Sequence, residues 1–196
     1  MSILVVTANY FWPSFSRPRR MRRLTQEESD KVFAKLDQFV GDRKDELLKD
    51  HNIYLHNKNV FYVSNLLYKK VSNIPKKNIA MIGTHIGRFT RSDRFFLKVG
   101  ALNVLSAYVT KKVWIKWSAE MNFLYGNNVL KSHVLRTTED LKDRDVVFLY
   151  NPRDVLLGFG ITARNMDSFN RADHNSLFII KQCDKGEYIR NEATIL

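Results

Sequence analysis

The chain has a single cysteine, Cys183, so two of its own cysteines cannot form a disulfide. Small secreted domains are commonly held together by several disulfides, so this scarcity favours a reducing compartment. No apolar run reaches the roughly 18 residues that a membrane-spanning helix needs, and the sequence therefore predicts no membrane partner. With 44% hydrophobic residues the chain can still bury a packed core, which excludes a disordered protein.

Motifs for metal binding and catalysis are also missing. His51 and His56 are near neighbours, but no cysteine pair or third histidine stands at the spacing of a metal site. The segment Gly158-Phe159-Gly160 lacks the third glycine and the following helix of a dinucleotide site. Inside a strand, such glycines more often permit a bend or a close backbone approach. The sequence predicts no metal, no cofactor and no enzymatic activity.

Positive charge, in contrast, is in excess. The formal net charge of +12 favours a polyanionic partner, either nucleic acid or an anionic membrane surface. Residues 1–23 hold five arginines and no acid, residues 24–110 carry +5, and residues 111–196 carry only +2. Because the second half is nearly neutral, any site for a polyanion there must be local.

Residues 1–20 are predicted to be a disordered extension, with an unused upstream start codon as the alternative explanation. The extension holds Arg17, Arg19 and Arg20 and no acid. This composition also fits a mitochondrial targeting segment, a nuclear-localisation signal or an RNA-binding patch. The extension alone therefore leaves the destination of the protein open.

Residues 21–110 predict an α+β domain with an antiparallel sheet. Thr25 and Glu28 form a capping box at the start of an amphipathic helix that ends at Gly41. Strands are expected at 53–56 and 60–63 around a polar turn, followed by a helix that Ser64 caps and Pro75 ends. A strand at 78–84, a turn at 87–90 and a strand at 94–99 complete this half, and residues 110–112 form the predicted boundary.

Residues 111–190 predict a small closed barrel, followed by a tail at 191–196. A strand at 113–116 leads into a short helix that stops at Gly126, and Val129 and Leu130 return to the core. Further strands are expected at 145–150, 155–163 and 176–181. Closure into a barrel would remove the open sheet edges that invite aggregation.

This order of strand, short helix, Gly-x-Gly hairpin and final strand resembles the PUA domain, a compact RNA-binding barrel. The segments 123–132, 156–160 and 186–190 resemble a family of two-domain large-ribosomal-subunit biogenesis factors, the nuclear import protein seven family. The resemblance covers residues 21–196. It implies an α+β fold in which an N-terminal antiparallel sheet with helices precedes a C-terminal PUA-type β-barrel.

The resemblance also implies a function and partners. A member of this family is expected to be a non-catalytic, RNA-binding assembly factor for pre-60S particles, required for 27S pre-rRNA processing and 60S subunit biogenesis in the nucleolus. Its partners would be pre-rRNA and other assembly factors, including an rRNA cytosine methyltransferase, which it would join as a monomer. The alternatives are an RNA-modifying enzyme with an unrecognised active site in residues 21–110 and a pure protein-interaction module.

Aromatic and cationic residues around the first barrel strand favour RNA binding. Trp114, Trp117, Phe123 and Tyr125 offer stacking surfaces near lysines. The alternative, favoured for Trp114 and Phe123, is that they fill the barrel. PUA domains hold RNA with the short helix, the turn after it and neighbouring strand edges, and the resemblance places these contacts on Lys131, Arg136, Arg164, Arg171 and Lys181. Archaeal relatives have a basic cluster over residues 164–171, where this chain has only two arginines.

A second candidate surface lies in the first half. Arg88, Arg91 and Arg94 occupy or flank the predicted turn, and several neutralised phosphates would make RNA affinity salt-dependent. The alternative explanation is a solvated charged face. These three arginines complete the set of predicted RNA-binding residues.

Overall fold

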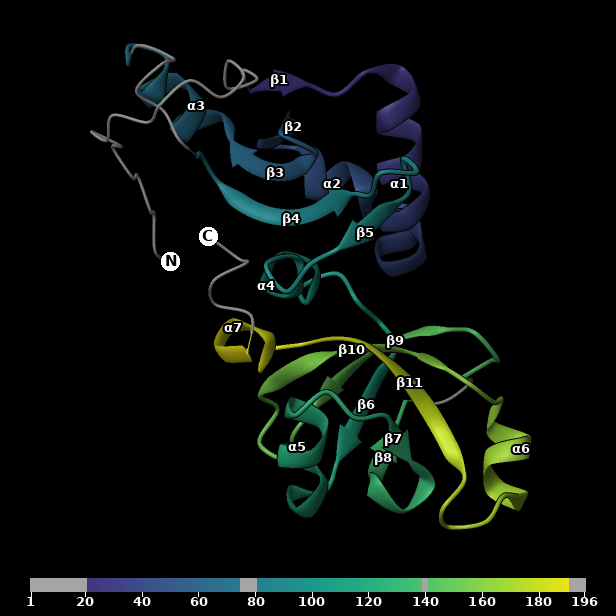
Figure 1. The fold of residues 1–196 in the computed structure, drawn as a ribbon. Coiled ribbons are helices and arrows are strands. Elements are labelled where there is room, and N and C mark those ends of the chain that lie inside the picture. Colours follow the sequence, from purple (N-terminus) through teal and green to yellow (C-terminus); the bar gives the residue numbers. More distant parts are fainter. Residues whose placement is uncertain (1–20, 75–80, 139–140, 191–196) are drawn as a thin grey trace. The chain divides into compact units, whose positions relative to one another are not determined.

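The structure, a computed structural model, describes residues 21–74, 81–138 and 141–190 (Figure 1). It divides into two compact units, with the boundary between Ala101 and Leu102. The predicted boundary at 110–112 lies within the second unit and reaches the first residue of its first strand. The predicted extension at 1–20 and the tail at 191–196 lie outside the described residues.

The first unit is built on a five-stranded antiparallel sheet in the order β1-β2-β3-β4-β5. Its strands are β1 (Arg22–Arg23), β2 (His51–His56), β3 (Asn59–Ser64), β4 (Thr84–Phe89) and β5 (Phe95–Leu97). Its helical segments are α1 (Gln26–Val40), the 3-10 turn η1 (Gly41–Arg43), α2 (Lys44–Leu48) and α3 (Asn65–Val71). A further helix, α4 (Ala101–Leu105), spans the boundary between the units.

Helix α1 begins and ends as its sequence predicts. The Thr25 hydroxyl accepts from the amide of Glu28 at 3.4 Å, and the Glu28 carboxylate accepts from the amide of Thr25 at 2.9 Å. Gly41, with φ of +56°, ends the helix in a backbone conformation that glycine adopts without strain. The buried side of the helix consists of Val32, Leu36, Phe39 and Val40. The predicted capping box and apolar stripe are therefore confirmed.

The same carboxylate links α1 to β1 and gives the unit a pH-dependent contact. Arg22 binds Glu28 through two hydrogen bonds of 2.7 Å, and this ion pair lowers the pKa of Glu28 from 4.5 to about 2. A lowered pKa in the folded state means that the stabilisation is complete above pH 4.5 and is lost as the pH falls from 4.5 towards about 2.

Glu28→Gln is expected to lower the free energy of unfolding by about 1 kcal/mol at pH 7, because both ion-pair partners also contact water. Glutamine keeps one acceptor oxygen for the Thr25 amide, but it removes the charge and one of the two oxygens that bind Arg22. The deficit should shrink as the pH falls below 4.5, which urea unfolding at pH 7 and pH 3 measures. Glu27→Gln, an exposed neighbour in the same helical turn, is the matched control and should change little at either pH.

The two hairpins of the first unit meet at one end of the sheet. Asn57 and Lys58 join β2 to β3 with φ values of 47° and 68°, the left-handed pair that a tight two-residue hairpin needs. The amide of Phe89, at the end of β4, donates to the carbonyl of Lys58 at 2.8 Å. The predicted strands around this polar turn, and the helix capped by Ser64, are confirmed.

The predicted strand at 78–84 and turn at 87–90 are wrong in their described parts. Residues 78–80 lie outside the described residues, and the strand β4 begins only at Thr84 and continues through Phe89. The turn is instead at 90–94. Gly87 lies inside the strand, where a Cβ would be only 2.4 Å from the Phe95 ring. The position therefore needs glycine so that β4 and β5 can pack closely.

The second unit is a nearly closed barrel of six strands in the order β7-β11-β10-β9-β6-β8. All neighbours are antiparallel except β6 and β9, which are parallel. Its strands are β6 (Lys112–Ile115), β7 (Val129–Leu130), β8 (Val134–Thr137), β9 (Val146–Tyr150), β10 (Leu156–Thr162) and β11 (Leu177–Asp184). Its helical segments are α5 (Trp117–Leu124), η3 (Lys131–His133), α6 (Met166–Arg171) and α7 (Glu187–Arg190).

The barrel is filled by one apolar cluster, which contains Val113, Ile115, Phe123, Val147, Leu149, Phe178 and Ile179. One unit with a helix-bearing antiparallel sheet and a second unit with this barrel confirm the predicted α+β class. The strand order leaves β7 and β8 at its two ends, joined in sequence by η3.

The two glycines of β10 allow the backbone of β11 to come close, as their position in a strand predicts. A Cβ on Gly158 would lie 2.3 Å from the carbonyl oxygen of Cys183, and one on Gly160 would lie 2.7 Å from that of Ile180. The pairing of β10 with β11 shifts register between Phe159 and Gly160, where the ladder bends. These glycines are a packing requirement of the barrel wall.

Strand β8 and helix α6, like the short helical segments η3 and α7, have no counterpart in the sequence prediction. Strand β8 is short and half exposed, so it lacks the apolar alternation that marks a buried strand. Helix α6 is amphipathic over only six residues, and its start depends on Asn165, whose side chain accepts from the amide of Ser168 at 2.9 Å. Local pattern is weak in both segments.

Candidate nucleic-acid interface

Helix α6 presents the two arginines of the segment in which relatives were expected to carry a basic cluster. Arg164 lies just before the capping residue Asn165, and Arg171 is the last residue of the helix. Both side chains are exposed, and neither has a hydrogen bond or ion pair with any described residue. They are therefore available to an anionic ligand.

Lys131 is bound to the end of the same helix. Its ammonium donates to the carbonyl oxygens of Asn170 at 2.9 Å and Ala172 at 2.8 Å, and it lies 5.4 Å from the centre of the Phe169 ring. A cation at a helix C-terminus satisfies carbonyls that have no partner within the helix. Lys131 thus positions α6 and Arg171. Because its ammonium already donates two hydrogen bonds, it has fewer N–H groups left for a ligand.

Arg136, on strand β8, lies against an indole on the outside of the barrel. Its guanidinium is 3.8 Å from the centre of the Trp114 ring and 3.3 Å from the carboxylate of Asp154, to which the indole N–H also donates. The prediction that Trp114 fills the barrel is wrong, because Val113 and Ile115 occupy the inward positions of β6 and alternation turns Trp114 outward.

Two further cation–aromatic pairs continue this surface. Arg153 lies 5.1 Å over the ring of Trp117, which is 52% exposed, and Lys112 lies 5.5 Å over Tyr150. Phe123 is buried in the core, as predicted. We call this set the cation–aromatic face, and it comprises the outward-facing Lys112, Trp114, Trp117, Arg136 and Arg153 and the buried ring of Tyr150 beneath them.

Sequence reasoning missed Arg153 and Lys112. Arg153 stands in the turn after Asn151, whose side-chain oxygen accepts from the amides of Arg153 at 3.0 Å and Val155 at 2.9 Å. That turn was the only local sign in the sequence that the Arg153 side chain would lie on the surface. The exposed aromatic stripe continues along α5, where Trp117, Met121 and Tyr125 lie at successive helical turns and are each more than half exposed.

Lys181 belongs to a buried charge cluster. Its ammonium lies 2.8 Å from the carboxylate of Asp184 and 3.5 Å from that of Glu187, and only 16% of its side chain is exposed. Arg190 binds the same Asp184 carboxylate at 2.8 Å. The structure therefore places Lys181 among intramolecular partners, away from the free arginines of α6.

The three arginines predicted to bind RNA in the first unit lie with a lysine at the meeting point of the two hairpins. Arg88 is on β4, Arg91 is in the following turn, and Arg94 precedes β5; Lys58 joins them by donating to the carbonyl of Thr90 at 3.4 Å. All four side chains are exposed, and within the described residues none has an ion pair. We call this set the basic hairpin tip. Lys58 was missed because its partners are distant in sequence.

Residues 21–74, 81–138 and 141–190 hold neither a metal-ligand cluster nor a membrane-spanning helix. No three histidine, cysteine or carboxylate side chains gather there as they would around a metal ion. No helix in these ranges is long and apolar enough to cross a membrane.

Comparison with known proteins covers nearly the whole chain. Residues 21–99 match the model of the NIP7/UPF0113 pre-PUA domain, and residues 111–193 match that of the UPF0113 PUA domain. The chain is 40% identical over 180 residues to the "60S ribosome subunit biogenesis protein NIP7 homolog" of Rattus norvegicus. It is 37% identical over 182 residues to the "60S ribosome subunit biogenesis protein nip7" of Schizosaccharomyces pombe. Each alignment covers 89% of this chain and 99% of the relative.

Solved structures of low sequence identity share the fold. A PUA domain protein from Aeropyrum pernix superposes with a TM-score of 0.57 at 11% identity and covers 88% of this chain and 90% of its own. A conserved PUA domain protein from Thermoplasma acidophilum gives the same TM-score and identity and covers 87% and 98%. The PUA type predicted for the barrel is therefore confirmed, and the chain belongs to the NIP7 family, whose members join a pre-PUA domain to a PUA domain.

Proposed function

We propose that this protein is a non-catalytic, RNA-binding assembly factor of pre-60S ribosomal particles. The relatives that match it over nearly their full length are named as 60S ribosome subunit biogenesis proteins. The observation that carries RNA binding is a pair of exposed arginines, Arg164 just before the cap of α6 and Arg171 at its end, which have no side-chain partner among the described residues. Unpaired arginines on a nearly neutral domain provide the local positive charge that phosphates require.

The mechanism is positioning of an RNA segment relative to a protein partner. Residues 111–190, as the PUA domain, would hold the RNA with the arginines of α6 on phosphates and with Trp117 and Tyr125 on unstacked bases. Arg136 would reinforce this contact from the cation–aromatic face. Residues 21–110, as the first domain, would dock other assembly factors, among them an rRNA cytosine methyltransferase. The protein would act as a monomer within the particle, in the nucleolus, and support 27S pre-rRNA processing.

The test is a titration of a fluorescently labelled uridine-rich RNA with the full chain, followed by anisotropy. The logarithm of the affinity should fall linearly with the logarithm of the salt concentration between about 50 and 200 mM, because bound phosphates release counterions. Absence of salt-sensitive binding would overturn the RNA-binding role. Turnover in a methyl-transfer or pseudouridylation assay with the isolated protein would overturn the non-catalytic role.

The basic hairpin tip gives a separate prediction. Arg91→Glu combined with Arg94→Glu should weaken RNA binding about threefold and reduce the salt slope by about 1–2, the loss expected for one or two phosphate contacts. The same titration at several salt concentrations measures both quantities. An unchanged slope would show that the tip is only a solvated charged face.

A further inference from the structure

We infer that a pocket beside the edge of strand β2 binds an extended peptide of a protein partner, one that carries a bulky apolar side chain flanked by acidic residues. The proposal deepens the partner-docking role proposed above for residues 21–110 and rests on it. It does not involve the RNA-binding residues, so the two can be tested separately.

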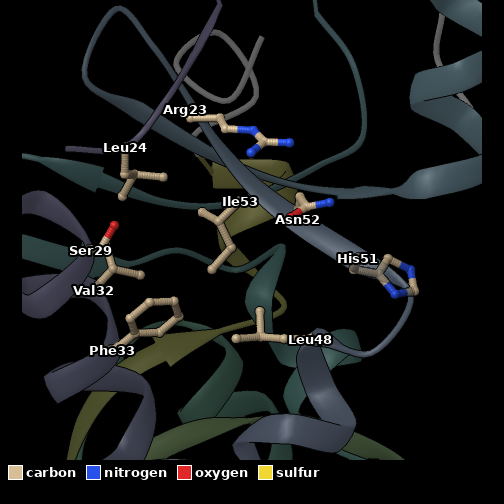
Figure 2. Close-up of a pocket in the computed structure, with 9 residues that line it drawn as sticks. All are labelled: Arg23, Leu24, Ser29, Val32, Phe33, Leu48, His51, Asn52 and Ile53. Carbon is tan, nitrogen blue, oxygen red and sulfur yellow. The ribbon is translucent and has the colours of Figure 1, made fainter. Parts of the chain in front are cut away.

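The pocket lies between α1, α2 and β2 and has a volume of about 230 Å³ (Figure 2). In Figure 2 the side chains of Phe33, Leu48 and Ile53 approach it from these three elements, and Leu24 closes it beside β1. We call it the β2-edge pocket, and its lining is Arg23, Leu24, Ser29, Val32, Phe33, Leu48, His51, Asn52 and Ile53.

The size of the pocket fits a single large side chain. Small-molecule and cofactor sites usually measure about 300–1,000 Å³, which is larger than this pocket. A dry apolar cavity of about 150 Å³ already accepts a benzene molecule, so a phenylalanine or leucine side chain has enough room here. Five of the nine lining residues are apolar, which suits such an anchor.

An open sheet edge runs along the pocket. Strand β1 pairs with β2 only through Arg22 opposite Leu55 and Arg23 opposite Tyr54, after which the chain turns away into α1. Among the described residues, none pairs with Asn52 or Ile53 on this side, whereas β3 pairs with β2 along its whole length on the other side. An extended peptide can continue the line of β1 and gain backbone hydrogen bonds, while one side chain enters the pocket.

The charge of the pocket selects an acidic peptide. Arg23 is the only arginine or lysine among the lining residues, and no carboxylate lines the pocket. The neighbouring Arg22 is already neutralised by Glu28, but no carboxylate among the described residues pairs with Arg23. An acidic residue beside the apolar anchor would supply the missing counter-charge.

A nucleobase fits the pocket less well. The ring of Phe33 has Lys44 over one face at 4.2 Å, and the ring of His51 is stacked on Tyr62 at 4.3 Å between centroids. Base recognition in single-stranded RNA depends on exposed aromatic faces, whereas four of the five apolar lining residues here are aliphatic.

The experiment follows the amide spectrum of the ¹⁵N-labelled full chain during titration with the peptide acetyl-Thr-Glu-Val-Phe-Val-Glu-Thr-amide. Saturable shifts are expected at Asn52, Ile53 and Phe33. Replacing the central phenylalanine of the peptide with serine should weaken binding at least tenfold. Ser29→Phe, which fills the pocket from α1, should do the same, whereas Ala34→Phe, an exposed position on the same helix, should bind as the native chain does.

A charge exchange tests the role of Arg23. Arg23→Glu should weaken binding of the acidic peptide about threefold or more, and it should strengthen binding of a peptide in which both glutamates are replaced by lysines. Lys31→Glu, at an exposed position on α1, is the matched control. Absence of saturable shifts, or binding that Ser29→Phe leaves unchanged, would overturn the proposal. Displacement of the peptide by oligouridine would also overturn it, because a nucleobase would then occupy the pocket. Dimerisation that Ser29→Phe abolishes would overturn it as well, because a second copy of the chain would then occupy the pocket.

The RNA titration on the same preparations separates the two proposals. If RNA binds and the peptide does not, the pocket proposal fails and RNA binding stands. If the peptide binds and RNA does not, RNA binding fails and the pocket remains a docking site.

Discussion

Asp184→Asn is expected to lower the free energy of unfolding by about 3–5 kcal/mol, because removing one partner of a buried ion pair leaves the others uncompensated. The Asp184 side chain is fully buried and binds Lys181 and Arg190, each at 2.8 Å. The substitution keeps the shape of the side chain, removes its charge and replaces one of the two acceptor oxygens with an NH2 group. Equilibrium unfolding in urea, followed by circular dichroism, measures the loss.

The loss should spread beyond the ion pairs, because this cluster fastens the C-terminal part of the barrel to α5. Arg190 donates to the carbonyl of Leu124 at the end of α5, and a Cβ on Gly186 would lie 2.1 Å from that same oxygen. Without the carboxylate, α7 loses the charge that holds its arginine in place. We therefore expect α7 to separate from the barrel before the strands unfold.

Two further variants separate this effect from a general sensitivity to lost charge. Asp167→Asn, in the exposed first turn of α6, should change stability by less than about 0.5 kcal/mol. Lys181→Met added to Asp184→Asn should recover part of the loss, because it removes one of the uncompensated cations. A loss below about 1 kcal/mol for Asp184→Asn would show that water reaches the cluster and screens it.

Arg164→Glu combined with Arg171→Glu is expected to weaken RNA binding at least tenfold, about 1.4 kcal/mol. The two residues stand at opposite ends of α6, and both are exposed and unpaired among the described residues. Reversal replaces two attractive charges by two that repel phosphates. Because neither side chain loses a partner within the described parts of the chain, the fold should be intact, which circular dichroism checks.

A charge-matched control makes this result specific. Lys31→Glu combined with Lys49→Glu changes the net charge equally at exposed positions of the first unit. The control should weaken binding by less than threefold through the general field of the protein. Equal losses in the two double variants would show that net charge governs affinity, and unchanged binding by the α6 variant would place the RNA elsewhere.

Much of the fold follows from patterns that are local in the sequence. The capping box at Thr25, the hairpin turn at Asn57 and the buried strands of the barrel each depend on residues close to one another. The strand β4 was misplaced because glycine is typical of turns and Gly87 was therefore assigned to one. In the structure Gly87 makes room for the Phe95 ring on the neighbouring strand. A glycine that permits packing cannot be distinguished locally from one that permits a turn.

The candidate interface was less predictable because its side chains are set by partners far along the chain. Lys131 binds carbonyls of Asn170 and Ala172, roughly forty residues on, and so supports α6. Arg153 meets Trp117 through the fold of the barrel. The sequence therefore identified only some of the cations, and both the remaining ones, such as Arg153, and the division into free and engaged groups required the structure.

The close contact between β10 and β11 has a practical consequence for labelling chemistry. Cys183 is only 2% exposed, Gly158 lies against its carbonyl, and burial raises the pKa of its thiol, which keeps the sulfur in its unreactive protonated form. Since Cys183 is the only cysteine, the native protein should resist maleimides and mild oxidants. A cysteine placed on α6 or beside the β2-edge pocket would then carry a fluorophore at one defined position.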